Sequence, residues 1–161
     1  MAKATEIDIE ARAKAGRENF LKGYNCAQSV IATFADIYPS DDIDTLLRLS
    51  ASFGGGMGRL RMTCGAASGM FMLAELENGS ATPGNMEART RNYALVQELA
   101  AKFKEENDSL ICAELLGMRT GKIEPPRPSE RTTEYYRERP CPRLVECACR
   151  IYAHHLANKN D

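Results

Sequence analysis

The feature that most constrains the fold of this chain is the spacing of its apolar residues, which recur at three- and four-residue steps. Ala27, Val30, Ile31 and Phe34 have this spacing, directly after the N-cap candidate Asn25. The repeat places apolar side chains on one face of an α-helix, whereas a half-buried strand needs strict alternation. The sequence contains no convincing alternation and no repeat of fixed period. It therefore predicts an all-α fold.

Breaks between the periodic stretches divide the chain into about six helices of a compact bundle. Prolines and glycines mark most of the breaks, and Ser, Asp or Asn precedes most of the expected helix starts. The connections are short, which favours antiparallel neighbours in the bundle. We expect helices over about residues 9–22, 25–38, 42–53, 63–77, 85–106 and 141–157, with a further short helix near 109–116.

Residues 118–140 differ from the rest of the chain and are expected to form one long irregular loop. They contain Pro125, Pro126 and Pro128 among dense mixed charges, with one short helix expected near residues 134–138. A connection of this length within a compact domain is often a lid, a partner contact or a mobile segment. These three interpretations remain open at the level of the sequence.

The composition is that of an ordinary globular protein, and residues 1–161 are expected to form one helical domain. The net charge of −1 and the aromatic content of 7% without tryptophan argue against nucleic acid as a partner. No uninterrupted apolar span could cross a bilayer, and the first ten residues lack the apolar run of a signal peptide. We therefore expect no membrane insertion and a cytoplasmic location.

Cysteine is the residue type that bears most directly on function. In a reducing compartment the six cysteines do not indicate a static disulfide framework, which leaves metal ligation, redox chemistry or plain burial. Four of them, Cys26, Cys64, Cys112 and Cys141, lie at or near expected helix starts. Unpaired N–H groups and the helix dipole favour a thiolate there. Burial would explain any single cysteine equally well, but the shared placement favours chemistry for the set of four.

Two other pairs of residues are interpreted as structural. Cys147 and Cys149 are two residues apart on a helix and point to nearly opposite sides, so core packing is the better interpretation for both. Tyr135 and Tyr136 could face a substrate or a second subunit, but they are interpreted as packing anchors for the irregular loop.

A glycine-rich stretch leads into Cys64 and is a candidate binding element for a substrate or cofactor. Its glycines permit backbone conformations closed to other residues and allow another group to approach, and its arginines could lower the pKa of Cys64. The stretch has neither the Gly-Lys-Ser/Thr of a Walker loop nor the spacing and preceding strand of a dinucleotide site. A simple helix-to-helix turn with exposed arginines is an equally good interpretation. The candidate residues are Gly54, Gly55, Gly56, Gly58, Arg59 and Arg61.

Several ordered motifs together resemble the C_GCAxxG_C_C family, which comprises small bacterial and archaeal proteins described as redox-active. The motifs are Gly23–Val30 (GYNCAQSV), Phe53–Gly58 (FGGGMG), Cys64–Gly69 (CGAASG), Cys112–Gly117 (CAELLG) and Cys141 ahead of Leu144 and Val145. The resemblance covers about residues 16–156 and implies an all-helical fold in which Cys26, Cys64, Cys112 and Cys141 form the four-cysteine pattern. Selenocysteine in some relatives implies redox chemistry. The resemblance supplies neither a substrate nor a cofactor.

Three hypotheses of function follow. The first is a thiol–disulfide redox protein of the oxidoreductase class, in which Cys64 attacks and Cys26, Cys112 or Cys141 resolves the mixed disulfide. The second is a metal or iron–sulfur protein that uses the same four thiols as ligands. The third is a non-catalytic helical assembly protein with buried cysteines. The thiol hypothesis requires no cofactor. Its partner would be an unidentified redox protein or a small-molecule substrate. The amphipathic helices could also pair two subunits into a homodimer.

Overall fold

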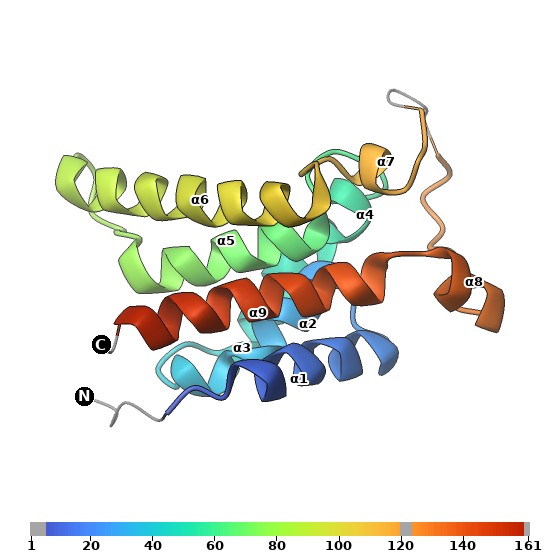
Figure 1. Cartoon of the computed structure of the whole chain (residues 1–161). Coiled ribbons are helices and arrows are strands. Elements are labelled where there is room, and N and C mark those ends of the chain that lie inside the picture. Colours follow the sequence, from blue (N-terminus) through green and yellow to red (C-terminus); the bar gives the residue numbers. More distant parts are fainter. Residues whose placement is uncertain (1–5, 120–123, 160–161) are drawn as a thin grey trace.

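The computed structural model describes residues 6–119 and 124–159, and these form an all-α fold, as the sequence predicts (Figure 1). Within these ranges there is no named strand, only an isolated antiparallel bridge between Thr63 and Ile111. Six helices have eight residues or more: α1 (Ile9–Leu21), α2 (Cys26–Thr33), α3 (Ile43–Ser50), α5 (Gly65–Asn78), α6 (Met86–Asn107) and α9 (Cys141–Lys159). Three are shorter: α4 (Gly54–Met57), α7 (Cys112–Leu115) and α8 (Thr133–Glu138).

The C-terminal helix α9 runs through the centre of the bundle. It packs against α1, α2, α5 and α6, and its fully buried Tyr152 meets Phe34 edge-on at a ring-centroid distance of 5.0 Å. Figure 1 shows that α5 and α9 run in the same direction, so their N-terminal ends share one end of the molecule with α4 and α7. The opposite end of the bundle carries the C-terminal ends of both helices.

Local caps explain why several helices begin where the sequence predicts. Asn25 forms a capping box with Gln28 at the start of α2, and Asp42 and Asn85 cap α3 and α6 by accepting hydrogen bonds from backbone N–H groups. The predicted helix at 25–38 is shorter than expected. It ends at Thr33 and tightens into a 3₁₀ turn at 35–37 ahead of a proline.

Helices α5 and α7, which have Cys64 and Cys112 at their starts, begin later than the expected residues 63 and 109. Thr63 does not cap α5; it forms the bridge with Ile111, and Cys64 itself occupies the N-cap position. Asp108 ends α6 in a left-handed conformation, so α7 begins after Ile111, whose N–H donates to the Ser109 hydroxyl at 2.9 Å. Backbone hydrogen bonds therefore link residues 62–64 to residues 110–113: the Cys64 N–H donates to the Leu110 carbonyl, and the Cys112 N–H donates to the Met62 carbonyl.

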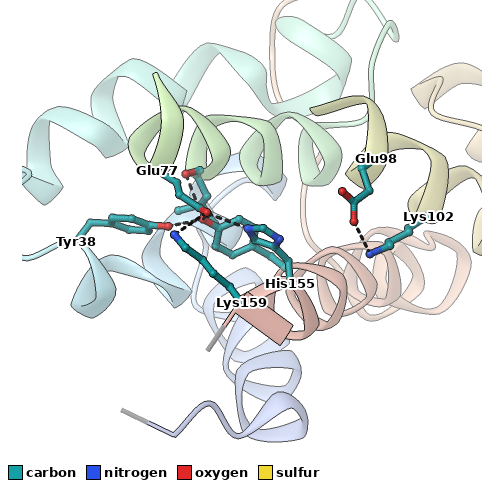
Figure 2. A network of polar contacts seen from close by, with 8 residues as sticks. Tyr38, Glu77, Glu98, Lys102, His155 and Lys159 are labelled. Carbon is teal, nitrogen blue, oxygen red and sulfur yellow. Dashed lines mark hydrogen bonds and ion pairs between the residues drawn. The ribbon is translucent and has the colours of Figure 1, made fainter. Parts of the chain in front are cut away.

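A polar cluster occupies the C-terminal ends of α5 and α9 (Figure 2). The carboxylate of Glu77 accepts hydrogen bonds from His155 at 2.9 Å, Lys159 at 2.8 Å and the Tyr152 hydroxyl at 3.3 Å. The hydroxyl of Tyr38 lies against that of Tyr152. Burial raises the pKa of Glu77, but the hydrogen bonds from His155 and Lys159 outweigh burial and bring it down to about 2.

None of the helices in the described ranges is both long enough and apolar enough to span a membrane.

Candidate functional site

The helix starts at one end of the bundle surround a cavity of about 360 Å³. Each of the four cysteines singled out in the sequence lines this cavity, although they lie far apart in the chain. The residues of the glycine-rich stretch that were candidates for binding also line it: Gly54, Gly55, Gly56, Gly58, Arg59 and Arg61. The structure therefore brings the whole set of candidate residues to one place.

The four cysteines line one cavity because each of them lies at the start of a helix, and these helix starts lie at the same end of the molecule. Cys26, Cys112 and Cys141 are the first residues of α2, α7 and α9, and Cys64 is the N-cap residue of α5. The expectation that all four lie at helix starts is confirmed. Helices α2, α5 and α9 are in mutual contact, and the residues at their starts line the same cavity.

Glycines set how closely these elements approach. A Cβ atom on Gly65 would lie only 3.0 Å from the Cβ of Cys26, and one on Gly56 would lie 2.7 Å from the Cβ of Cys112. Real Cβ atoms essentially never show a distance as short as that at Gly56, and the distance at Gly65 is tighter than nine in ten of their contacts. The absence of a side chain at these two positions is therefore what allows α5 to pack on Cys26 and the glycine-rich stretch to pack on Cys112.

The glycine-rich stretch contains the short α4, but its backbone is a left-handed turn, because Gly55 and Gly56 have non-helical φ and ψ angles. Residues 55–59 all have positive φ, including Met57 at 71° and Arg59 at 68°. The N–H of Gly58 donates to the Gly54 carbonyl at 3.1 Å and to the Ser52 carbonyl at 2.8 Å, which closes the turn. Left-handed conformations are unfavourable for residues with a side chain and often occur at functional sites.

Two arginines from this turn point toward the cavity and meet Glu124 of the irregular loop. Arg59 Nη2 lies 3.1 Å from one carboxylate oxygen of Glu124, and Arg61 Nε donates to the other oxygen. Arg61 Nη1 also lies 3.7 Å from Cys112 Sγ. The arginines were expected to act on Cys64, but Arg61 acts most directly on Cys112, where it lowers a pKa that burial raises.

Cys141 is the thiol of the cavity whose thiolate is most strongly favoured. Interaction with the Cys26 thiol lowers its pKa to about 6, against the effect of burial, and the charge of Arg139 and the hydroxyl of Tyr135 contribute in the same direction. The same contact raises the pKa of Cys26 well above its usual value, and burial raises it further. The pKa values of the two thiols are thus shifted in opposite directions, which favours the thiolate at Cys141 and the protonated thiol at Cys26.

Cys64 behaves in the opposite way from the sequence-based expectation. Burial raises its pKa to about 12, although the backbone N–H groups of Ala67 and Ala66 favour the thiolate. Cys64 is only 4% exposed, so the loss of hydration raises its pKa by more than the N–H groups of the helix start lower it. The prediction that the helix start would make Cys64 an activated thiolate is therefore wrong on the direction of the pKa shift.

The remaining two cysteines are buried away from the cavity, as expected for core packing. Burial raises the pKa of Cys149 to about 12, and Cys149 lies against Gly16 of α1, where an added Cβ would be 2.4 Å from its sulfur. Cys147 Sγ donates to a carboxylate oxygen of Glu106 at 3.1 Å, and burial raises its pKa to about 11. Neither cysteine lines the cavity.

Sequence reasoning missed three residues that bear on the cavity: Tyr135, Arg139 and Glu124. Tyr135 packs against the hydrophobic core, as interpreted, but it also lines the cavity and helps to lower the pKa of Cys141. Its neighbour Tyr136 does pack, edge-on against Phe20 at 6.4 Å. The position of Arg139, two residues before Cys141, was a usable signal. No signal in the sequence near Glu124 indicated its role, because its partners Arg59 and Arg61 lie more than 60 residues earlier in the chain.

In the described ranges there is no group of three or more His, Cys, Asp or Glu side chains arranged to hold a metal ion. The metal hypothesis for Cys26, Cys64, Cys112 and Cys141 therefore gains no support from their geometry. The two sulfurs that interact most strongly are Cys26 and Cys141, and the structure has every cysteine as a free thiol.

Comparison with known proteins gives one match. A family model described as "Putative redox-active protein (C_GCAxxG_C_C)" matches residues 24–155, which is most of the chain and includes the four cysteines of the cavity. No curated protein and no solved structure matches the chain.

Proposed function

The chain belongs to the C_GCAxxG_C_C family of proteins described as redox-active, and we propose that it performs thiol–disulfide exchange through Cys141 and Cys26. The observation that carries the proposal is that Cys141 and Cys26 line the same cavity, where the pKa of Cys141 is lowered to about 6. Cys141 acts as the attacking thiolate and Cys26 as the resolving thiol.

The choice of Cys141 over Cys64 follows from the requirements of exchange. The attacking species is the thiolate, and a thiol whose pKa is near ambient pH combines thiolate population with nucleophilicity. With a pKa of about 6, Cys141 is mainly thiolate at pH 7. Cys64, with a pKa of about 12, is almost entirely protonated at that pH.

The proposed half-reaction oxidises the protein dithiol and reduces a disulfide. The Cys141 thiolate attacks one sulfur of the substrate disulfide, and the first thiolate leaves as the mixed disulfide forms. Cys26 then loses its proton to that thiolate and attacks Cys141 Sγ, which expels the second thiolate. The products are a Cys26–Cys141 disulfide, one thiol and one thiolate, so two electrons pass from the protein to the substrate.

The test is to map the products of a reaction with a small disulfide. Reduced protein is mixed with bis(2-hydroxyethyl) disulfide, quenched in acid, and its disulfides are identified by peptide mass spectrometry. We expect a Cys26–Cys141 disulfide in the wild type and a stable mixed disulfide on Cys141 in the Cys26→Ser variant. Cys141→Ser should abolish both products, whereas the control Cys147→Ser should leave both unchanged.

Two outcomes would overturn the assignment. If Cys64→Ser prevents the reaction while Cys141→Ser permits it, then Cys64 is the nucleophile. If the wild type forms no adduct at any cavity cysteine under conditions in which a simple thiol reacts, the exchange function itself is wrong.

A further inference from the structure

We propose that Arg59 and Arg61 bind the carboxylate of a small anionic disulfide or thiol, and that Glu124 occupies this anion site in the absence of substrate. The identity of the ligand as a redox substrate rests on the proposed exchange function. The binding of a carboxylate by the two arginines does not, and it is tested separately below.

The charge of the site favours an anion. The side chains of Arg59 and Arg61 are 17% and 9% exposed, and they share the carboxylate of Glu124. Two positive charges therefore face one negative charge, and both arginines line the cavity whereas Glu124 does not. Among the described residues, Arg59 Nε is buried without a hydrogen-bond partner, so a donor of the site remains unused. Paired guanidinium groups suit the planar, two-oxygen geometry of a carboxylate.

The backbone holds both arginines in a conformation that side chains rarely adopt. The φ angles of Arg59 and Arg61 are 68° and 59°. The surrounding contacts fix this arrangement, because the Arg61 N–H donates to the Gly55 carbonyl at 3.2 Å and the Ala113 N–H donates to the Arg61 carbonyl at 3.1 Å. The turn thus presents two guanidinium groups to a single point before any ligand arrives.

The anion site is continuous with the thiols. Arg61 Nη1 is 3.7 Å from Cys112 Sγ, and the arginines and the Cys26–Cys141 pair line the same cavity of about 360 Å³. This volume suits a small molecule. Apolar side chains complete the lining, and they match a short aliphatic chain between the carboxylate and the sulfur: Phe20, Leu115, Leu116, Pro126, Pro128 and Leu144.

Glu124 resembles an internal substitute for such a ligand. Its carboxylate receives hydrogen bonds from both arginines, and Arg59 also contacts Ser129 and the Arg127 carbonyl in the same segment. Further along the segment, Arg131 donates to the Phe20 and Tyr24 carbonyls. A ligand carboxylate would take over the donors now used by Glu124, so removing the Glu124 charge should strengthen anion binding.

Binding is tested with a dicarboxylate that cannot undergo exchange, 3,3′-thiodipropionate, by isothermal titration calorimetry on the reduced protein. Glu124→Gln should tighten binding about tenfold, and Arg59→Gln should weaken it by a similar factor. The matched control is Glu130→Gln, which removes an exposed carboxylate of the same segment and should leave binding unchanged. The neutral diamide of the probe should bind more weakly than the dicarboxylate.

Exchange is tested with three disulfides of similar length: 3,3′-dithiodipropionate, bis(2-hydroxyethyl) disulfide and cystamine, which are anionic, neutral and cationic. Each rate is divided by the rate with free glutathione, which removes the intrinsic reactivity of the reagent. The anionic disulfide should be preferred about tenfold or more over the neutral one, and Arg59→Gln should abolish the preference while retaining the reaction with the neutral reagent.

The two tests separate the proposals. Equal binding of the dicarboxylate and its diamide, or no effect of Glu124→Gln on binding, would overturn the anion site whatever the exchange rates. Binding of the dicarboxylate with the expected variant effects, but no reaction with any disulfide, would support the anion site and overturn the exchange function.

Discussion

The two ends of helices α5 and α9 carry opposite chemistry. Their N-terminal ends hold Cys64 and Cys141 at the cavity, whereas their C-terminal ends hold the carboxylate of Glu77 between His155 and Lys159. A helix N-terminus favours negative charge and a C-terminus favours positive charge. A lowered pKa at Cys141 therefore agrees with its position, while Glu77 lies at an unfavourable end and depends on the side chains of His155 and Lys159 that α9 supplies.

The difference between the ends lies in the partners of the ionised group. Glu77 is held by His155, Lys159 and Tyr152, none of which lines the cavity, and so its charge stabilises the packing of α9 on α5. Cys141 is held by Cys26, a group that can form a bond with it, and both line a cavity. The lowered pKa of Glu77 therefore indicates a structural role, whereas that of Cys141 agrees with the proposed exchange function.

The largest expected effect concerns the rate of thiol alkylation. Site-resolved alkylation with iodoacetamide should modify Cys141 at a rate that rises with pH through about 6 and then levels off, because the thiolate is the reactive form. At pH 7, Cys64 and Cys149, whose pKa values are about 12, should react at least ~100-fold more slowly. Cys26→Ser should move the midpoint for Cys141 toward the ordinary thiol pKa of about 8.5.

The control for this prediction is Cys147→Ser, which removes a buried thiol outside the cavity and should leave the profile of Cys141 unchanged. Faster alkylation of Cys64 than of Cys141 at pH 7 would contradict the assignment of the lower pKa to Cys141.

At the other end of the bundle, Glu77→Gln should reduce the free energy of unfolding by roughly 2–3 kcal/mol at pH 7. The pKa of Glu77 is lowered from 4.5 to about 2 in the folded state, so its contribution is complete above pH 4.5 and is lost as the pH falls toward 2. Urea denaturation at pH 7, 4.5 and 3 should show the difference between wild type and variant narrowing at the lowest pH.

The matched control is Glu98→Gln, which breaks the exposed ion pair with Lys102 on the surface of α6, drawn in Figure 2. Its side chain is 57% exposed, so the expected cost is below about 0.5 kcal/mol. A cost as large as that of Glu77→Gln would mean that loss of a carboxylate, not the cluster, causes the effect. Alkylation of Cys141 should be unchanged in both variants.

Two glycines of the left-handed turn provide a third test, because they share a backbone conformation but not a packing environment. Gly56 and Gly58 have φ of 67° and 58°, so alanine at either position should cost about 1 kcal/mol in backbone strain. At Gly56 the new Cβ would also lie 2.7 Å from the Cβ of Cys112, whereas no described atom lies within 4 Å of it at Gly58.

Gly56→Ala should therefore reduce the free energy of unfolding by a further ~1–3 kcal/mol relative to Gly58→Ala, as measured by urea denaturation. Equal costs for the two variants would show that contact with Cys112 does not constrain the turn.

The sequence predicts those parts of this site that depend on short-range pattern. The caps at Asn25 and Asp42, and the placement of four cysteines at helix starts, follow from residues within one turn of each position. The raised pKa of Cys64 cannot be predicted in this way, because the direction of the shift depends on burial, and burial is set by the packing of several helices. In the same way, Glu124 meets Arg59 across 65 positions, and nothing near Glu124 in the sequence indicates that contact.

The smallest expected effect concerns Tyr135, which distinguishes a hydroxyl that stabilises the thiolate from a ring that only packs. Tyr135→Phe removes a hydrogen-bond donor from Cys141 and should raise its pKa by about one unit, toward the ordinary value. The change can be followed by the thiolate absorbance near 240 nm as a function of pH. Tyr136→Phe is the matched control, because Tyr136 packs on Phe20 and does not line the cavity. Equal shifts in the two variants would assign the effect to packing of α8, whereas a shift confined to Tyr135→Phe would extend the Cys26–Cys141 pair to a network of three residues.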